Sequence, residues 1–417
     1  MTPERALPAL TAETIRIADP GPLVSVLAEH SPLLWRRRGF GMAGFGEALR
    51  LTFSGANRMT DAAAAWRAIV ADASVTDPLQ IPGSGLVALG TFAFSAESSQ
   101  SSVLIVPSIV VGRSGTDFWL TRISLSELPA AALPTPAPLG EPFGTELTPG
   151  RTSPANYLAA VRDAIGHIRA GKLSKVVIAR DLVGTMPAGA DQRPMILALA
   201  DGYPDCWTFA IDGFLGASPE TLVSVHGGSV TARVLAGSAA RGVDANSDLE
   251  AASALATSTK DQDEHEFAVQ NVLSSLRPHS PAVTASDTPF TLKLPNLWHL
   301  ASDVEGILVD GSSSLDLLSS LHPTAAVAGT PTTEAIAVID QLEPFDRGRY
   351  AGPVGWVGAD GDGEWAIALR CAQVSEDGRV TAWAGAGIVA DSDPDHELVE
   401  TRMKFRPIVE AFAPPAD

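Results

Sequence analysis

Short apolar segments separated by glycine-containing turns recur through most of this chain. Their patterns predict strands at 85–94, 103–111, 117–124, 350–357 and 383–390. Four more segments, joined by Asp-Gly and Gly-Gly turns, predict one continuous antiparallel meander; they are 207–211, 214–217, 222–225 and 230–235. Consecutive strands joined by such short turns favour antiparallel sheets over a doubly wound parallel fold.

Helical patterns interrupt the strands. Ser153-Pro154 opens a helix that Gly171 ends, and a strand beginning at Lys175 follows at once. The charged stretch 258–267 precedes apolar residues spaced as one face of a helix, namely Val269, Val272, Leu273 and Leu276. The order of strands, helix, meander, long helices and strands predicts an α+β architecture in which antiparallel sheets carry helices on their outside.

A second charged helix is predicted near the end of the chain. Asp393 and Pro394 form a capping pair, and Glu397, Glu400 and Lys404 then share one face of the helix. Such a face is commonly only a solvated surface. Here the two charged helices flank apolar, glycine-punctuated strands, so their carboxylates are candidates for a site.

Composition divides the chain without separating it into independent domains. Residues 128–150 are rich in Pro, Ala and Gly and predict an exposed connection. Before them, residues 1–127 show a loosely patterned β-rich part, and after them residues 151–412 carry nearly all of the motifs described below. We expect the two parts to form one enzyme body over residues 1–417.

Charge and hydropathy exclude several kinds of partner. The 417 residues are 45% hydrophobic and 18% charged, which predicts a sizeable core, and the net charge is −19. That charge repels nucleic acid and anionic membrane surfaces. The N-terminal residues 1–5 lack the pattern of a signal peptide, and no window resembles a membrane span. We therefore expect a cytoplasmic protein that binds neither nucleic acid nor a membrane.

Cysteine and lysine are both scarce. Cys206 and Cys371 lie in apolar strand-like segments, so buried thiols are expected and not a disulfide or metal site. Of the 29 basic residues only five are lysines, namely Lys172, Lys175, Lys260, Lys293 and Lys404. Lysine can lose its proton when its pKa is lowered, whereas arginine cannot, so each lysine is a candidate for catalysis.

A series of motifs occurs in the order found in chorismate-utilising enzymes. They are Lys175-Val-Val-Ile-Ala-Arg180, Gly216-Ala-Ser-Pro-Glu-Thr-Leu222, Leu235-Ala-Gly-Ser238, Lys260-Asp-x-x-Glu264-His265, Trp298-His299, His322-Pro-Thr324, Tyr350-Ala-Gly-Pro-Val-Gly-Trp356, Ala368-Leu-Arg370, Gly385-Ala-Gly-Ile388 and Glu397-x-x-Glu400-Thr-x-x-Lys404. The chain resembles this family, and among its members most resembles the isochorismate synthases. The resemblance implies two large antiparallel sheets packed as a sandwich, with the active site between the sheets and the flanking helices.

The resemblance also implies a magnesium site. Chorismate is a dianion, and a chain of charge −19 needs cations to hold it. Glu264 and Glu400 match the residues that would hold Mg²⁺ against the ring carboxylate, with Glu397 beside them. Carboxylate oxygens are the ligands that this hard cation prefers.

An acid and a base are implied in the same way. Isochorismate forms when water adds at C2 of the ring and the C4 hydroxyl leaves. Lys175 matches the lysine that activates the water, and Glu220 matches the general acid. A base must be neutral in some fraction and an acid must keep its proton near neutral pH, so burial of both groups is expected.

Further residues match substrate-binding positions of the family. They are Tyr350, Arg370, Gly385, Lys404, Ser238, His299 and Thr324. Arg370 suits a carboxylate because its guanidinium can donate two parallel hydrogen bonds to it. For His265 a structural hydrogen bond and a site role are both open, while Arg180 and Lys260 are expected to orient carboxylates.

The lysine at 175 favours water over ammonia as the nucleophile and so favours isochorismate synthase. A salicylate synthase, which would go on to eliminate pyruvate, and a non-catalytic chorismate-binding protein are the alternatives. The product would feed menaquinone or siderophore synthesis. With no heptad pattern or exposed apolar helix in the sequence, a monomer is expected.

Overall fold

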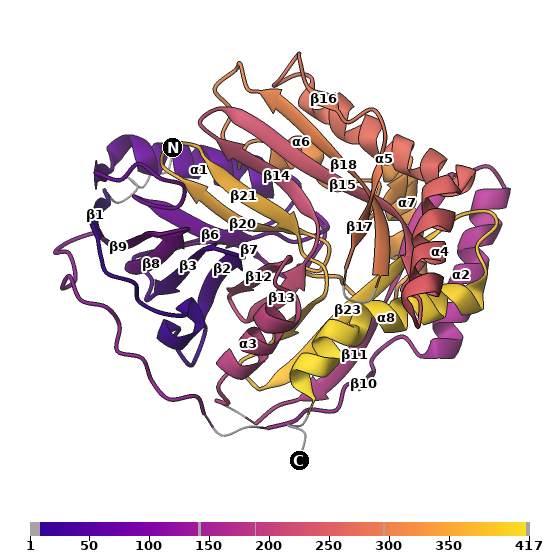
Figure 1. Cartoon of the computed structure of the whole chain (residues 1–417), viewed down its shortest axis with the longest axis horizontal. Coiled ribbons are helices and arrows are strands. Elements are labelled where there is room, and N and C mark those ends of the chain that lie inside the picture. Colours follow the sequence, from indigo (N-terminus) through magenta and orange to yellow (C-terminus); the bar gives the residue numbers. More distant parts are fainter. Residues whose placement is uncertain (1–8, 141–142, 188, 295–296, 414–417) are drawn as a thin grey trace, which may run out of the picture.

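The protein is described by a computed structural model over residues 9–140, 143–187, 189–294 and 297–413. Across these residues the strands form a 13-stranded sheet and a 10-stranded sheet, with helices on the outside (Figure 1). Neighbouring strands are antiparallel, apart from the short pairing of β1 with β5. The predicted α+β architecture of antiparallel sheets is therefore confirmed.

We call the larger sheet the first sheet and the smaller one the second sheet. In the first, the order is β10 (Thr148–Pro149), β11 (Lys175–Thr185), β23 (Arg379–Ile388), β22 (Cys371–Val374), β13 (Phe214–Ser218), β12 (Trp207–Ile211), β2 (Leu33–Arg37), β3 (Phe40–Phe45), β8 (Ile109–Ser114), β9 (Asp117–Ser124), β1 (Thr11–Arg16) and β5 (Ser74–Thr76), and β19 (Gly329–Thr330) also pairs with β11. In the second, the order is β16 (Thr284–Ala285), β18 (Leu297–Ile307), β15 (Ser229–Ala240), β14 (Thr221–His226), β21 (Gly363–Ile367), β20 (Pro353–Gly358), β6 (Val87–Thr91), β7 (Ser102–Val106) and β4 (Leu49–Phe53), and β17 (Phe290–Lys293) also pairs with β18.

In each sheet a block of strands from the C-terminal part of the chain is joined to a block of strands from the N-terminal part. In the first sheet β2 pairs with β12, and in the second β6 pairs with β20. The connection between the two parts of the chain contains the short strand β10 and otherwise passes along the lower edge of the molecule in Figure 1. The N-terminal strands are thus structural members of the two sheets from which the site is built.

The two sheets face each other across an aromatic core. Trp35 on β2 reaches from the first sheet and donates from Nε1 to Glu364 Oε2 of the second sheet, at 3.3 Å. Trp356 of the second sheet donates to the same oxygen, also at 3.3 Å. Trp35 also stacks on Trp207, with ring centroids 4.6 Å apart. A buried carboxylate is satisfied by two indole donors here, as a buried polar group requires.

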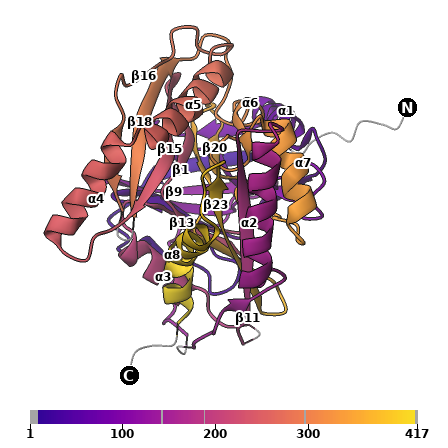
Figure 2. The same ribbon diagram turned by 90° about the vertical axis from the view of Figure 1, so that its right-hand side faces the viewer.

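Most of the helices cover one end of the sandwich. The helices are α1 (Arg58–Asp72), α2 (Pro154–Arg169), α3 (Arg193–Gly202), α4 (Ala245–Thr257), α5 (Thr259–Leu276), α6 (Leu318–Leu321), α7 (Thr332–Leu342) and α8 (Pro394–Phe412), with a 3₁₀ turn at Leu23–Val26. α2 and α7 pack on β11, α5 packs on β15 and α8 packs on β23. Figure 2 shows these four helices facing the viewer from that end.

The two charged helices begin where the sequence predicts. The Ser258 hydroxyl accepts from the backbone N–H of Asp261 and caps α5, whose predicted apolar face is buried. The Asp393 carboxylate accepts from the N–H groups of Asp395 and His396 and caps α8. The predicted thiols, Cys206 and Cys371, are buried and free.

Two predictions about strands were wrong for the same reason. The segment 103–111 is not one strand, because β7 belongs to the second sheet and β8 to the first. The expected meander is likewise divided, because β12 and β13 lie in the first sheet and β14 and β15 in the second. Apolar patterns report burial, and a chain that crosses between two facing sheets stays buried throughout.

No helix in the described part of the chain is both long and apolar enough to cross a membrane. The N-terminal residues 1–5, considered above for a signal peptide, lie outside the described residues.

Candidate active site

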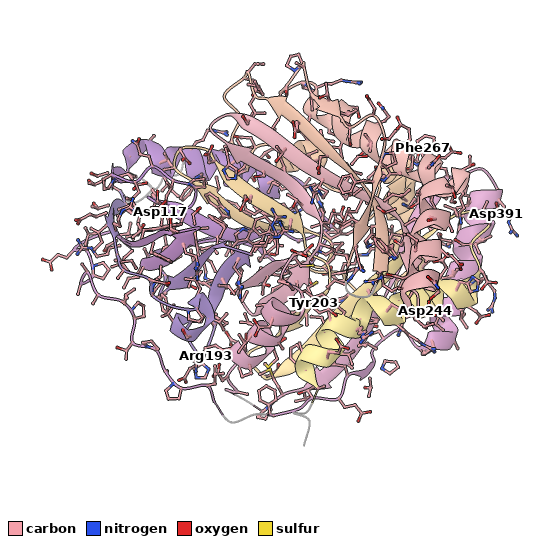
Figure 3. All side chains as sticks on the ribbon, in the orientation of Figure 1. Asp117, Arg193, Tyr203, Asp244, Phe267 and Asp391 are labelled. Carbon is pink, nitrogen blue, oxygen red and sulfur yellow. The ribbon has the colours of Figure 1, made fainter. Side chains whose placement is uncertain are left out.

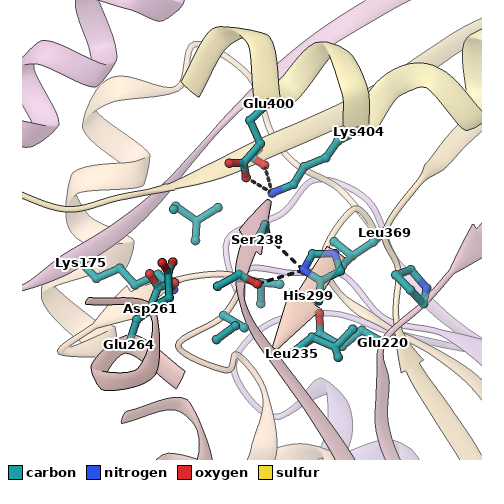
Figure 4. A pocket seen from close by; sticks show the side chains of 18 of the residues that line it. Lys175, Glu220, Leu235, Ser238, Asp261, Glu264, His299, Leu369, Glu400 and Lys404 are labelled. Carbon is teal, nitrogen blue, oxygen red and sulfur yellow. Dashed lines mark hydrogen bonds and ion pairs between the residues drawn. The ribbon is translucent and has the colours of Figure 1, made fainter. Parts of the chain in front are cut away.

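A cavity opens between the two sheets and the helices α5 and α8. It encloses about 990 Å³, including the part that is open to solvent. Of the residues predicted for the site, those that line it are Lys175, Glu220, Ser238, Glu264, His299, Tyr350, Arg370, Gly385, Glu397, Glu400 and Lys404. Residues from positions 175 to 404 thus meet in one place (Figure 4).

Lys175 is the first residue of β11 and is buried against its neighbour strand. Its Nζ lies 2.5 Å from Glu264 Oε1 on α5. Gly387 on β23 makes room for this side chain, since a Cβ at that position would lie 2.9 Å from Lys175 Cε. The absence of a side chain at Gly387 is therefore a condition for the position of Lys175.

Glu220 lies where the chain crosses from the first sheet to the second, between β13 and β14. Its backbone is fixed, because Glu220 O accepts from Ile367 N at 3.1 Å and Glu220 N donates to Ser218 Oγ at 3.2 Å. Burial raises the pKa of the Glu220 carboxyl to about 7, even though Arg370, Lys175 and Lys404 act in the opposite direction. Glu220 can therefore keep a proton near neutral pH and give it to a leaving group.

The charged face of α8 enters the same cavity. Lys404 Nζ lies 2.6 Å from Glu400 Oε1 and donates to Gly385 O at 3.0 Å. Burial raises the pKa of Glu400, but the ammonium of Lys404 more than offsets this, and the pKa lies below its ordinary value. Burial and the charge of Glu400 raise the pKa of Glu397 to about 7.

The carboxylates of α5 and α8 supply the oxygen donors that Mg²⁺ prefers. Asp261, Glu264, Glu397 and Glu400 all line the cavity. Within the described ranges no three His, Cys, Asp or Glu side chains converge closely enough to hold a metal by themselves. Mg²⁺ commonly keeps several waters and needs only one or two protein carboxylates beside an anionic ligand. The donor set therefore fits Mg²⁺ on condition that water and substrate complete its coordination.

Ser238 and His299 are cross-strand neighbours on β15 and β18. Ser238 Oγ lies 3.0 Å from His299 Nδ1, and the bulge at Gly237, where φ is +79°, places Gly237 O 3.3 Å from the same nitrogen. Burial, together with the charges of Arg370 and Lys404, lowers the pKa of His299 to about 3. Its buried Nε2 has no hydrogen-bond partner in the described structure. A neutral imidazole thus offers one free nitrogen to a ligand.

Tyr350 and Arg370 line the same cavity. Arg370 has a φ of +50°, and its carbonyl accepts from Ala217 N at 3.1 Å. Burial lowers the pKa of its guanidinium, which makes no ion pair with the residues described. The Tyr350 ring stacks on Trp383, and its hydroxyl lies 3.2 Å from where a Cβ of Gly385 would be. Arg370 is therefore a free, buried cation that an anionic ligand could satisfy.

Some predicted residues lie elsewhere. Thr324 does not line this cavity but a smaller adjoining one, which also contains Glu220. Arg180 donates to Thr401 Oγ1 at 2.8 Å and lies over the ring of Phe405. His265 has its two ring nitrogens 3.2 Å from Ala236 O and 2.9 Å from Ser302 Oγ, so it holds α5 to the second sheet.

The cavity also contains residues that were not predicted as part of it. Asp261 and Gly387 line it, and Lys260, which was expected only to orient carboxylates, lines it too. Asp261 precedes Glu264 by one helical turn, and Gly387 follows Gly385 by two residues in a strand. These spacings place Asp261 on the same helix face as Glu264 and Gly387 on the same strand face as Gly385. They are the signals in the sequence from which the two additional residues could have been predicted.

Comparisons with known proteins agree with this site. The chain matches the family described as chorismate binding enzyme over residues 12–130 and 137–413. It is 40% identical over 271 residues to isochorismate synthase DhbC of Bacillus subtilis, covering 62% of this chain and 68% of the relative. It is 33% identical over 411 residues to the salicylate biosynthesis isochorismate synthase of Pseudomonas aeruginosa, covering 91% and 84%.

A solved structure shows the same fold over nearly the whole chain. MenF, the menaquinone-specific isochorismate synthase of Escherichia coli, superposes with a TM-score of 0.80 at 26% identity, covering 98% of this chain and 95% of that one. The family match extends over more than half of the chain and includes every residue that lines the cavity. The chain therefore belongs to the family of chorismate-binding enzymes.

Proposed function

We propose that this chain is an isochorismate synthase that converts chorismate to isochorismate with Mg²⁺. The observation that carries the proposal is the placement of Lys175 and Glu220 in one cavity, on different elements (Figure 4). The reaction forms a C2–O bond with water and breaks the C4–O bond, so it needs a base and an acid at two separate points of the ring. The relatives named above are isochorismate synthases, which supports the same reaction here.

In the proposed mechanism Lys175, as a neutral amine, accepts a proton from the attacking water as its oxygen bonds to C2. The ring double bonds shift, and the C4 hydroxyl leaves as water with the proton that Glu220 gives up. One water is taken up and one is released, so substrate and product are isomers. The raised pKa of Glu220, about 7, allows this residue to be protonated before the reaction.

The remaining cavity residues would hold the substrate. Arg370 and Lys404 supply the positive charge for its carboxylates, and Tyr350, Ser238 and His299 offer polar groups to its other oxygens. Glu264 and Glu400, with Glu397 beside them, would hold Mg²⁺. The ion, when bound, offsets the repulsion between these carboxylates and the dianionic substrate.

The proposal is tested by chromatographic analysis of the products from chorismate, with and without Mg²⁺. We expect isochorismate as the main product with Mg²⁺, none after chelation, and a near-complete loss of product in Lys175→Ala and in Glu220→Ala. Salicylate with pyruvate as the main products would instead identify a salicylate synthase. Tight binding of chorismate without turnover would identify a non-catalytic binding protein.

A further inference from the structure

Two lysines of the candidate active site contact the same carboxylates that are proposed to hold Mg²⁺. Lys175 Nζ lies 2.5 Å from Glu264 Oε1, and Lys404 Nζ lies 2.6 Å from Glu400 Oε1. All four residues line the cavity between the sheets and the helices α5 and α8 (Figure 4). Each of the two proposed metal ligands is therefore already neutralised by an ammonium group.

The two carboxylates lie on the inward faces of helices whose other faces reach the surface. Phe267 on α5 and Asp391, just before α8, lie at the outer surface on one side of the molecule (Figure 3). Glu264 and Glu400 of the same two helices line the cavity, and their side chains are only 20% and 25% exposed. Charges in such a shielded place interact more strongly than charges in water.

A carboxylate in this place cannot hold an ammonium group and Mg²⁺ at the same time without a cost. Mg²⁺ carries two positive charges, so an ammonium group that stays on the same carboxylate repels the ion. Mg²⁺ also demands a nearly fixed geometry of its oxygen ligands, which leaves a ligand little freedom to be shared. An ion that binds Glu264 therefore has to displace Lys175.

The two lysines differ in what holds them besides the carboxylate. Lys404 Nζ also donates to Gly385 O at 3.0 Å, so it keeps an acceptor when Glu400 turns to a metal ion. For Lys175 Nζ, Glu264 is the only hydrogen-bond partner among the residues that the structure describes. Lys175 is therefore the lysine that is freed when its carboxylate is taken.

We propose that Mg²⁺ and Lys175 compete for Glu264, and that binding of the ion releases the proposed base into the active-site cavity. This inference rests on the proposed function. While Lys175 is paired, its Nζ is held against the carboxylate of Glu264. Once the pair is exchanged, the same nitrogen is free to meet the water that adds to C2. Metal binding then sets the position of the base as well as the charge of the site.

The first test measures Mg²⁺ binding by isothermal titration calorimetry without substrate. We expect Lys175→Met to bind Mg²⁺ about tenfold more tightly than the parent protein, since no ammonium group has to be displaced. Lys260→Met is the matched control, because Lys260 lines the same cavity one helical turn from Glu264 but has no ion-pair partner in the described part of the chain. It removes the same positive charge, and its Mg²⁺ affinity should stay within about threefold of the parent's.

The competition would be overturned by equal gains of affinity in Lys175→Met and Lys260→Met, which would show a general effect of charge. It would also be overturned if Lys175→Met bound Mg²⁺ no more tightly than the parent, or showed no measurable binding.

The second test follows the lysine itself by NMR. The chain has only five lysines, so protein labelled with ¹³C at lysine Cε gives five signals, which single Lys→Arg substitutions assign. Added Mg²⁺ should shift the signal of Lys175 and leave that of Lys172, an exposed lysine outside the cavity, in place. In Glu264→Gln the Lys175 signal should already lie near the position that Mg²⁺ produces in the parent. A Lys175 signal that stays in place while Mg²⁺ binds would contradict the release.

The two levels of inference fail differently. Neither test uses turnover, so both decide the competition even if the parent protein does not convert chorismate to isochorismate and the proposed function fails. If the parent forms isochorismate with Mg²⁺ but Lys175→Met binds the ion no more tightly than the parent, only the competition fails.

Discussion

Lys175 Nζ and Glu264 Oε1 lie 2.5 Å apart, so the proposed base and a proposed metal ligand are in direct contact. The two residues are 89 positions apart in sequence and come from β11 and α5. Glu264 would bind Mg²⁺, and Lys175 would accept a proton from the attacking water. Their contact places the proposed metal ligand and the proposed base at one point of the cavity.

Replacement of Lys175 by Met should remove the base while keeping a side chain of similar length. We expect kcat to fall by about 10²–10⁴-fold, the usual contribution of a general base. Steady-state kinetics with chorismate measures the loss, with Lys172→Met as the control. Activity within a few-fold of the parent would mean that another group activates the water.

Replacement of Glu220 by Gln should stabilise the fold at high pH. The pKa of Glu220 is raised to about 7 in the folded state from 4.5, so the folded state binds more protons than the unfolded state between these values. The free energy of unfolding of the parent therefore falls as pH rises through this window, by on the order of 3 kcal/mol from this one group.

This effect is measured by urea unfolding in the absence of metal at about pH 4 and about pH 8. Glu220→Gln should exceed the parent in stability at the higher pH and lose most of that advantage at the lower one. Glu250→Gln, an exposed position on α4, should show no such difference. A constant difference at both values would contradict the raised pKa of Glu220.

Removal of metal should stop turnover, and two carboxylates should set the metal requirement. We expect EDTA to abolish product formation and Mg²⁺ to restore it. Glu264→Gln and Glu400→Gln should each raise the Mg²⁺ concentration needed for half-maximal rate by about tenfold or more, since each removes one anionic ligand. Glu250→Gln should leave this Mg²⁺ concentration unchanged. Equal Mg²⁺ requirements in all three variants would exclude Glu264 and Glu400 as ligands of the metal.

A methyl group at Gly387 should displace Lys175. The added Cβ would lie 2.9 Å from Lys175 Cε, so the lysine side chain must shift away from its place beside Glu264. We expect Gly387→Ala to lose about tenfold or more in kcat, since small misplacements of catalytic groups are costly. Gly166→Ala on α2 has nothing within 4 Å and should keep its activity while gaining about 0.5–1 kcal/mol of stability. Full activity in Gly387→Ala would show that Lys175 tolerates the shift.

The ion pair of Arg347 and Glu343 should be a large contributor to stability when only one partner is removed. Their side chains are each 2% exposed and lie 2.6 Å apart, and Arg347 also donates to Val177 O at 2.8 Å and to Val327 O at 2.9 Å. Val177 and Val327 line the active-site cavity, so the pair joins two of its walls.

Arg347→Met leaves a buried carboxylate unpaired and should cost about 3–5 kcal/mol in urea unfolding. Arg406→Met removes a pair of the same length whose side chains are 62% and 52% exposed, and it should cost less than about 1 kcal/mol. Equal costs in the two variants would show that burial does not decide the strength of these pairs.

Local signals in the sequence predicted the two charged helices, because each helix begins at a capping side chain and has a regular spacing of apolar or charged residues. The caps at Ser258 and Asp393, the apolar face of α5 and the shared face of Glu397, Glu400 and Lys404 follow from the 3.6-residue period of a helix and its unpaired N–H groups. These are interactions within a few residues, so the sequence determines them directly. The motif series added the family, and the comparisons confirmed it.

Assignment of strands to sheets was decided only by the tertiary structure. The chain crosses between sheets at Pro107-Ser108 and at Pro219-Glu220, and the sequence on either side of each crossing has only the pattern of a strand, which does not say to which sheet that strand belongs. The second crossing is what delivers Glu220 to the cavity and buries it, and its raised pKa depends on that burial. Likewise the pairing of Lys175 with Glu264 depends on how α5 packs on β15. The sequence by itself determined which helix faces the charged residues of α5 and α8 occupy, because those depend on local periodicity, and its motif series supplied the candidate site residues by resemblance. Their meeting in one cavity, and the charges they hold there, depend on contacts between distant segments, which only the packed sheets and helices decide.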